Sequence, residues 1–170
     1  MDQREMKYIV EEVLRRVEHD SKKESTGLVT SHRITLSLAK KLIEKVERKA
    51  EELGVPVIIA VVDDRARPVA VSCMDDAFIA SYDIALNKAY TSAGLKMSTR
   101  EVGELSQPGA PLYGVQETNG GKIVIFGGGE PLILDGKMVG ALGISGGSLE
   151  QDTMLAEYGK NILEEVVLWP

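Results

Sequence analysis

Two glycine-rich stretches, FGGGEP at residues 126–131 and GISGGS at residues 143–148, have a composition that can hold an anion. Successive backbone N–H groups attract phosphate or carboxylate, especially where they precede a helix. Only the second stretch precedes a predicted helix, and the sequence has no Gly-x-x-x-x-Gly-Lys-Ser/Thr phosphate loop. The alternative is that both stretches are tight turns, in which glycine tolerates a positive φ, and the local pattern favours turns. The glycines concerned are Gly127, Gly128, Gly129, Gly146 and Gly147.

Lys88 interrupts the apolar side of a predicted helix, where Ala85 and Ala89 are its neighbours. A lysine in this place either extends its ammonium group to the surface or binds an anionic partner, and the pattern leaves both open. Asp83 lies five residues earlier, which is too far around the helix for an i,i+4 ion pair. Lys88 is therefore a candidate binding residue whose partner the sequence does not identify.

The remaining reactive residue types do not form a recognisable catalytic or metal-binding pattern. Cys73 lies in a predicted strand and is expected to be a small packed hydrophobe rather than a reactive thiol. His19 and His32 are the only imidazoles, and no Cys/His spacing completes a zinc site. His32 is either a surface residue or a haem-iron ligand. Asp63 and Asp64 fall at a strand end and turn, where aspartate is ordinary.

The composition excludes several classes of protein. A chain of 170 residues has room for one ordinary domain plus an appendage, and 44% hydrophobic with 27% charged residues is typical of a soluble globular protein. No apolar run is long enough to span a membrane, and charges interrupt the N-terminal apolar positions, unlike in a secretory signal. A single cysteine fits a reducing, cytoplasmic setting. The net charge of −6, with basic residues interleaved among acids, argues against nucleic-acid binding.

The first twenty residues predict an amphipathic helix with one narrow apolar stripe. The sequence then loses all periodicity and becomes rich in Ser, Lys, Glu and Thr, which predicts a solvated linker over residues 21–31. The folded domain is expected to span residues 32–170. The stripe of the terminal helix consists of Met6, Ile9, Val10, Val13, Leu14 and Val17.

The first half of the domain predicts a helix, a hairpin and a second helix. Thr35 is a plausible N-cap of a helix that ends before Gly54. VPVIIAVVDD predicts a buried strand, and DRARP turns the chain back into the strand VAVSCM. AFIASYDIALNKAYTSAGL predicts a helix, followed by a short helix at residues 99–105 and a long loop to residue 121. The inward residues of the second helix are expected to be Ile79, Tyr82, Ala85, Leu86 and Ala89.

The second half predicts three strands and a closing helix. KIVIF is read as one strand, and Asp135-Gly136 predicts a tight hairpin within PLILDGKMVGALGIS. Ser148 and Gln151 form a capping box that begins the last helix. Hairpin-linked strands with helices between them indicate an α+β fold: a central antiparallel sheet of about five strands covered by helices.

Several of these stretches resemble one protein family. ITLSLAKKLIEKVERKAEELGVPVIIAVVDD, SYDIALNKAYTS, LSQPGAPLYGV and GGKIVIFGGGEPLILDGKMVGALGISGGSLEQD look like the GlcG/HbpS-like family of haem-degrading domains. The same domain forms the C-terminal half of microcompartment-associated PduO-type corrinoid adenosyltransferases, whose adenosyltransferase half has no counterpart here. The resemblance implies a profilin-like fold, homo-oligomers and, in some members, haem binding. It makes His32 the candidate iron ligand, and Lys88, Tyr113 and the glycines candidate cofactor-binding residues.

The N-terminal segment carries a second, separate resemblance. KYIVEEVLRRV resembles the encapsulation peptides of bacterial microcompartment cargo, in which a short amphipathic helix is tethered to a complete domain. An isolated helix of this length is stable only when its stripe is buried. The alternative is that the helix packs on its own domain or across an oligomer interface.

Three functional hypotheses follow from these observations. The favoured one is a protein that binds haem, a corrinoid-related cofactor or another small ligand, and that lies inside a bacterial microcompartment in the cytoplasm. Residues 1–20 are then expected to bind shell or cargo proteins, with neither nucleic acid nor membrane as a partner. The alternatives are an enzyme acting on haem or a small anionic metabolite, and an oligomeric scaffold that organises cargo. No nucleophile–base pair is visible, so the enzyme question stays open.

Overall fold

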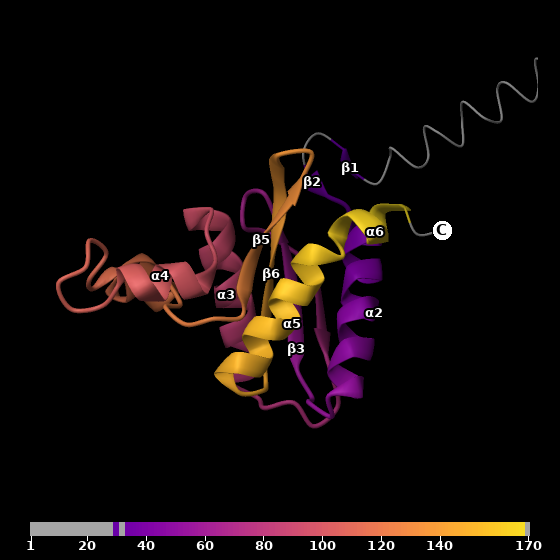
Figure 1. Cartoon of the computed structure of the whole chain (residues 1–170), viewed down its shortest axis with the longest axis horizontal. Helices are drawn as coiled ribbons and strands as arrows, with labels where there is room; N and C mark the ends of the chain where they lie inside the picture. The colour runs from indigo at the N-terminus through magenta and orange to yellow at the C-terminus, as the bar shows by residue number, and fades with distance from the viewer. Residues whose placement is uncertain (1–28, 31–32, 169–170) are drawn as a thin grey trace, which may run out of the picture.

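A computed structural model of the chain describes residues 29–30 and 33–168. Its centre is a four-stranded antiparallel sheet in the order β4-β3-β6-β5 (Figure 1). A separate pair of antiparallel strands of two residues each, β1–β2, precedes it. The elements are β1 (Val29–Thr30), β2 (Arg33–Ile34), α2 (Leu36–Glu52), β3 (Ile58–Asp63), β4 (Pro68–Cys73), α3 (Ser81–Leu95), α4 (Thr99–Leu105), the 3₁₀ turns Val115–Glu117 and Asn119–Gly121, β5 (Gly129–Leu134), β6 (Lys137–Ser145), α5 (Leu149–Asn161) and α6 (Leu163–Leu168).

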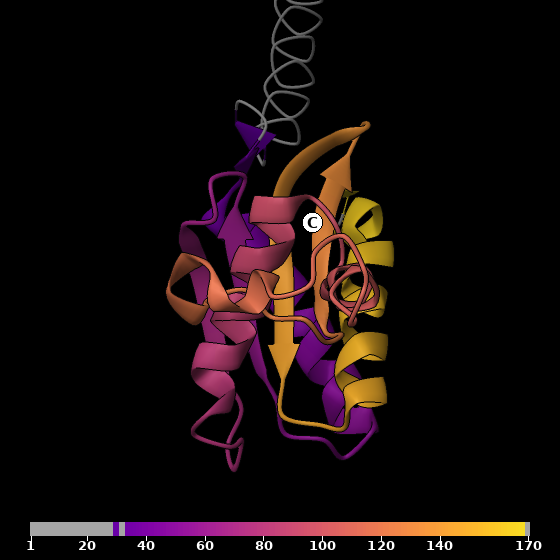
Figure 2. The same ribbon diagram turned by 90° about the vertical axis from the view of Figure 1, so that its left-hand side faces the viewer.

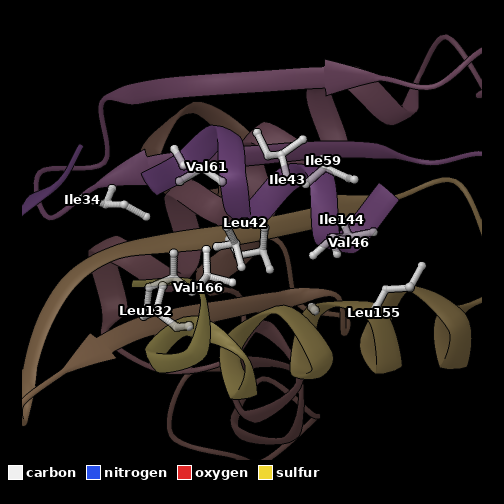
Figure 3. Close-up of a cluster of buried hydrophobic side chains, with 14 of the residues drawn as sticks. Ile34, Leu42, Ile43, Val46, Ile59, Val61, Leu132, Ile144, Leu155 and Val166 are labelled. Atoms are coloured by element: carbon white, nitrogen blue, oxygen red, sulfur yellow. The ribbon is translucent and has the colours of Figure 1, made fainter. Parts of the chain in front are cut away.

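The sheet lies between two layers of helix. Helices α2, α5 and α6 cover one face and α3 covers the other (Figures 1 and 2). Because β3 is buried on both sides, its residues alternate between two cores. Ile59 and Val61 face the larger core under α2 and α5 (Figure 3), while Ala60 and Val62 face α3. The predicted α+β class with a helix-covered antiparallel sheet is confirmed.

Local signals in the sequence position several elements correctly. The Thr35 hydroxyl accepts a hydrogen bond from the Leu38 N–H at 3.2 Å, and Gly54, with φ of +64°, follows the end of α2. Both predicted hairpins form, β3–β4 and β5–β6. Asp135 and Gly136 both have positive φ between the paired residues Leu134 and Lys137, as a two-residue hairpin loop requires.

The prediction of a strand at KIVIF is wrong, so the sheet has four strands rather than about five. This segment instead lies against α3 and α4. The Val124 N–H donates to the Thr91 hydroxyl at 3.0 Å, and the Ile125 carbonyl oxygen lies 2.3 Å from where a Cβ on Gly103 would be. Ile123 and Val124 are buried, which explains their apolar character without a strand ladder.

Two expected inward residues of the second predicted helix, Ile79 and Tyr82, are also misplaced. The helix begins only at Ser81, so Ile79 lies in the preceding turn and is 95% exposed, and Tyr82 is 45% exposed. Ala85 and Ala89 are buried as expected. Only small residues fit here because α3 packs tightly on β6: a Cβ on Gly143 would lie 2.0 Å from the Ala85 carbonyl oxygen.

Candidate functional site

Lys88 and the two glycine-rich stretches come together at one end of the sheet, where β6 ends and α5 begins. Lys88 is fully buried. Its ammonium group donates to the carboxylate Oδ2 of Asp152 at 2.7 Å and to the Ile144 carbonyl at 2.7 Å, and it lies 5.1 Å from the centre of the Phe126 ring. Lys88 therefore does not reach the surface. Its anionic partner is a carboxylate of the same chain.

Gly128 shows why the first glycine-rich stretch lacks side chains. It has a φ of +111°, and a Cβ at this position would lie 2.6 Å from the Lys88 Nζ and 2.8 Å from the Ile144 carbonyl oxygen. The stretch therefore closes directly over the ammonium group. No room is left there for an additional anion, so Lys88 and Gly128 form a packed structure rather than an open anion site.

The second glycine-rich stretch holds a carboxylate, and that carboxylate is Asp152. The Gly147 N–H donates to Asp152 Oδ1 at 2.9 Å, while Ser148 and Gln151 form the predicted capping box of α5. A backbone loop before a helix is a favourable place for negative charge, and here the chain supplies that charge itself.

Burial controls the ionisation of the Lys88–Asp152 pair. It raises the pKa of Asp152 and lowers that of Lys88, and each partner's hydrogen bond and opposite charge act against this effect. Because one proton can be held by either group, the pair carries no net charge in both arrangements. The floor of this region is therefore electrically neutral.

Two open pockets adjoin this pair and share Leu149 as a common wall. The serine pocket has a volume of about 380 Å³ and is lined by Phe78, Ser81, Phe126, Ser145, Leu149 and Asp152, among others. The methionine pocket has a volume of about 330 Å³, and its lining includes Arg100, Gly127, Leu149, Thr153, Met154 and Glu157.

Of the other candidate residues, none that the structure describes lies in this region. Tyr113 lies in the loop between α4 and β5 and is 67% exposed. His32 and the apolar stripe of residues 1–20 lie outside the described residues. Cys73 is exposed rather than packed, because it is the last residue of the edge strand β4. Within residues 29–30 and 33–168, no group of three or more His, Cys, Asp or Glu side chains is arranged to hold a metal ion.

Sequence reasoning missed the partners that complete the site. Asp152 lies 64 residues after Lys88, so no periodicity connects the two. Ser81 and Ser145 also meet only through the fold. One signal in the sequence could have identified Asp152. It is an acidic residue in the first turn of a capped helix, and that helix follows two glycines.

Known proteins resemble this chain over most of its length. The family model described as haem degrading protein HbpS-like matches residues 34–161. A 15.0 kDa protein from the dhaT–dhaS intergenic region of Citrobacter freundii is 52% identical over 78% of this chain and 94% of its own length. The corrinoid adenosyltransferase PduO of Salmonella typhimurium is 39% identical, but the match covers 79% of this chain and only 39% of that protein.

A solved structure agrees with these sequence matches. The PduOC:heme complex superposes with a TM-score of 0.73 at 37% sequence identity, over 76% of this chain and 94% of the other. No helix in the described part of the chain has the length and apolar character needed to cross a membrane. On the strength of the family match and of this shared fold, the chain belongs to the HbpS-like family.

Proposed function

We propose that this protein binds haem and that the haem lies in the methionine pocket. The observation that carries the proposal is the pairing of a thioether with a guanidinium group beside an exposed apolar wall. Met154 and Leu149 are 41% and 51% exposed, and Arg100 lines the same pocket. Methionine sulfur is an established type of axial ligand for haem iron, and arginine pairs well with carboxylates such as the haem propionates.

The openness of the methionine pocket also suits this group. The methionine pocket is open to solvent, so a flat macrocycle can enter with one edge and leave the rest outside. Arg100 forms an ion pair with Glu157 in the free protein, and a propionate can share that guanidinium group. Membership of the HbpS-like family and the structure of a relative with heme support the same ligand.

Haemin titration followed by visible absorption tests the methionine pocket. We expect Met154→Ala to weaken binding and to lower the reduction potential of the bound haem, because methionine ligation raises that potential. Met138→Ala is the matched control, since Met138 lies beside the β5–β6 hairpin loop, at the other end of β6. An unchanged spectrum, affinity and potential in Met154→Ala would remove Met154 as the ligand.

His32 is the alternative candidate for the iron ligand, in place of Met154, and is tested independently. The guanidinium group of Arg33, the next residue, pairs with Asp64 at the β3–β4 turn. The two pockets lie at the opposite end of β3, since Ile58 pairs with Ser145 at that end. His32→Ala, with His19→Ala as its control, is measured beside Met154→Ala to decide which of the two residues binds the iron. A Soret band that His32→Ala leaves unchanged would exclude His32.

We also propose that residues 1–20 direct the protein into a bacterial microcompartment. The support is the apolar stripe of this segment and the similarity of the chain to PduO. A fluorescent protein fused to residues 1–20 should concentrate in puncta in cells that produce shells. Val10→Glu with Leu14→Glu should abolish the puncta, whereas Glu12→Arg, outside the stripe, should preserve them. Diffuse fluorescence from the unmodified fusion would reject the targeting role.

Self-association is part of the same proposal. Several large apolar side chains outside the two pockets are exposed on the described surface, including Leu36, Ile79, Ile133 and Leu168. Exposed apolar groups of this size are common at contacts between copies of a chain. Light scattering of the purified protein should give a mass that is a multiple of the 18.5 kDa chain. A mass of one chain at micromolar concentration would contradict this expectation.

A further inference from the structure

The serine pocket has a polar floor built by three different elements. Ser145 is the last residue of β6, Ser81 is the first residue of α3, and Asp152 belongs to the first turn of α5. All three line the pocket, and their exposed fractions are only 4% for Ser81, 5% for Ser145 and 5% for Asp152. Buried polar groups that converge on one concave surface are the usual mark of a ligand site.

The hydroxyl group of Ser81 has a hydrogen to donate. The Ser145 hydroxyl donates to the Ser81 oxygen at 3.2 Å, which is long for a bond between two hydroxyl groups. Ser81 accepts in this bond, and within the described part of the chain its own O–H has no hydrogen-bond acceptor. A buried donor of this kind is unfavourable unless a ligand or water satisfies it.

The carboxylate of Asp152 has acceptor capacity to spare. Oδ1 accepts from the Gly147 N–H and Oδ2 accepts from Lys88. The Gly146 N–H also donates to this carboxylate. An ionised carboxylate offers about four acceptor positions, so these three contacts leave room for one further donor from the pocket. The floor of the pocket thus presents one donor, Ser81, and one acceptor, Asp152, which is the combination that a hydroxyl group matches.

The charge of the floor selects against ionic ligands. An anionic ligand would approach the Asp152 carboxylate, which repels it. A cationic ligand would find that carboxylate already paired with Lys88 at 2.7 Å. Since the pair has no net charge, a neutral ligand enters this environment at the lowest electrostatic cost.

The walls of the serine pocket are apolar and partly aromatic. Phe78, Phe126 and Leu149 are 71%, 45% and 51% exposed, so they offer contact area that the fold itself does not use. A volume of about 380 Å³ lies near the lower end of the range for ligand pockets, roughly 300 to 1,000 Å³. The ligand is therefore a small molecule with an apolar body.

We propose that the serine pocket binds a neutral small molecule that carries a hydroxyl group on an apolar body. The ligand hydroxyl accepts from Ser81 and donates to Asp152, while the body packs between Phe126 and Leu149. This site is separate from the methionine pocket, and the inference does not depend on haem binding.

Four probes of nearly equal shape separate the possible head groups: benzyl alcohol, toluene, benzylamine and benzoate. Each is titrated into the full-length protein and followed by amide chemical shifts. Benzyl alcohol should move the signals of Gly146, Gly147 and Leu149 but not that of Gly136 at the far hairpin. It should bind roughly five-fold more tightly than toluene, which makes neither hydrogen bond. Benzylamine, as its cation, and benzoate should bind more weakly than benzyl alcohol.

Substitution of Ser81 gives a second test. Ser81→Ala should weaken benzyl alcohol roughly five-fold and leave toluene unchanged, because only the alcohol uses the hydroxyl group. Ser37→Ala is the matched control, as Ser37 is exposed on α2, and it should bind all four probes like the wild type. Haemin binding should be the same in both variants. If Ser81→Ala does not fold, the order of the four probes on the wild type still decides.

Three results would overturn the proposal. Benzoate or benzylamine binding as tightly as benzyl alcohol would show that charge selects the ligand. Equal affinity of wild type and Ser81→Ala for benzyl alcohol would remove the hydroxyl contact. An absence of shifts at Gly146, Gly147 and Leu149 with all four probes would show that the pocket is not a ligand site.

Discussion

Each of the two buried charges, Lys88 and Asp152, is held in place by the other. Their ion pair is almost fully removed from water, so its own contribution to stability is small while the loss of one partner is costly. The Phe126 ring and the Gly128 backbone cover the ammonium group from the side of the first glycine-rich stretch. One ion pair therefore joins α3, the end of β6 and α5, and its Asp152 lies in the floor of the serine pocket.

Lys88→Met should destabilise the protein by about 3–5 kcal/mol, because it leaves the Asp152 carboxylate buried without its counter-charge. Urea denaturation at neutral pH measures the change. Lys40→Met is the control, since Lys40 is exposed on α2, and it should change the free energy of unfolding by less than about 0.5 kcal/mol. The double variant Lys88→Met, Asp152→Leu should recover much of the loss. A cost below about 1 kcal/mol for Lys88→Met would show that the pair is not buried as described.

The contribution of Asp63 to the stability of the fold depends on pH, and the contacts of its carboxylate determine the direction. Burial acts to raise its pKa, but hydrogen bonds from the Arg67 side chain and from the Arg67 and Arg65 N–H groups outweigh burial, so the pKa is lowered. A lowered pKa in the folded state gives stability that is present above the unfolded pKa, about 3.9, and is lost as the pH falls through the folded value.

Asp63→Asn should therefore be less stable than the wild type near neutral pH by about 1–2 kcal/mol, a figure kept low because Arg67 is 61% exposed. The difference should shrink as the pH falls below about 4. Urea midpoints measured from pH 7 down to pH 3 check this, with the exposed Asp135→Asn as the control. A difference that does not depend on pH would contradict the assignment.

At the scale of elements, the sequence predicts structure where the cause is local. All three local features form: the cap at Thr35, the Asp135-Gly136 turn and the Ser148 capping box. Each joins residues three positions apart. The strand predicted at KIVIF does not form, because this segment contacts Thr91 and Gly103, which lie far from it in the sequence. The Lys88–Asp152 contact was unpredictable for the same reason, since it exists only once α3 and α5 have packed on β6.

The two glycine-containing turns differ in a way that substitution can measure. Gly128 and Gly136 both have positive φ, but only Gly128 has neighbouring atoms where a Cβ would lie. Gly136→Ala should cost about 1 kcal/mol from backbone strain alone. Gly128→Ala should cost clearly more, because it also displaces Lys88 or the Ile144 carbonyl. Thermal unfolding of both variants gives the comparison, and equal losses would mean that the first stretch does not close over the ammonium group.

At the scale of the whole molecule, the layered architecture follows from burial but the strand order does not. A strand as apolar as Ile58–Asp63 needs cover on both faces, and the amphipathic α2 and the alanine-rich α3 provide it. Nothing in the spacing of the strands states that β6 rather than β5 pairs with β3. That order brings Ser145 and the start of α5 beside α3, so the candidate site depends on a feature that only the folded chain reveals.

The stability of the domain can be used to test the role of residues 1–28. The larger core is built from residues between Ile34 and Val166, and α2, α5 and α6 already bury its apolar side chains. If the N-terminal segment acts only as an address, deletion of residues 1–28 should change neither the free energy of unfolding nor its dependence on urea, because that dependence scales with the surface exposed on unfolding. If the segment instead packs on the domain, the deletion should lower both quantities. The double variant Val10→Glu, Leu14→Glu of the full-length chain separates the two roles. If the segment packs on the domain, this variant should lose stability as the deletion does. If the segment is an address, the variant should abolish delivery to shells and leave the free energy of unfolding unchanged.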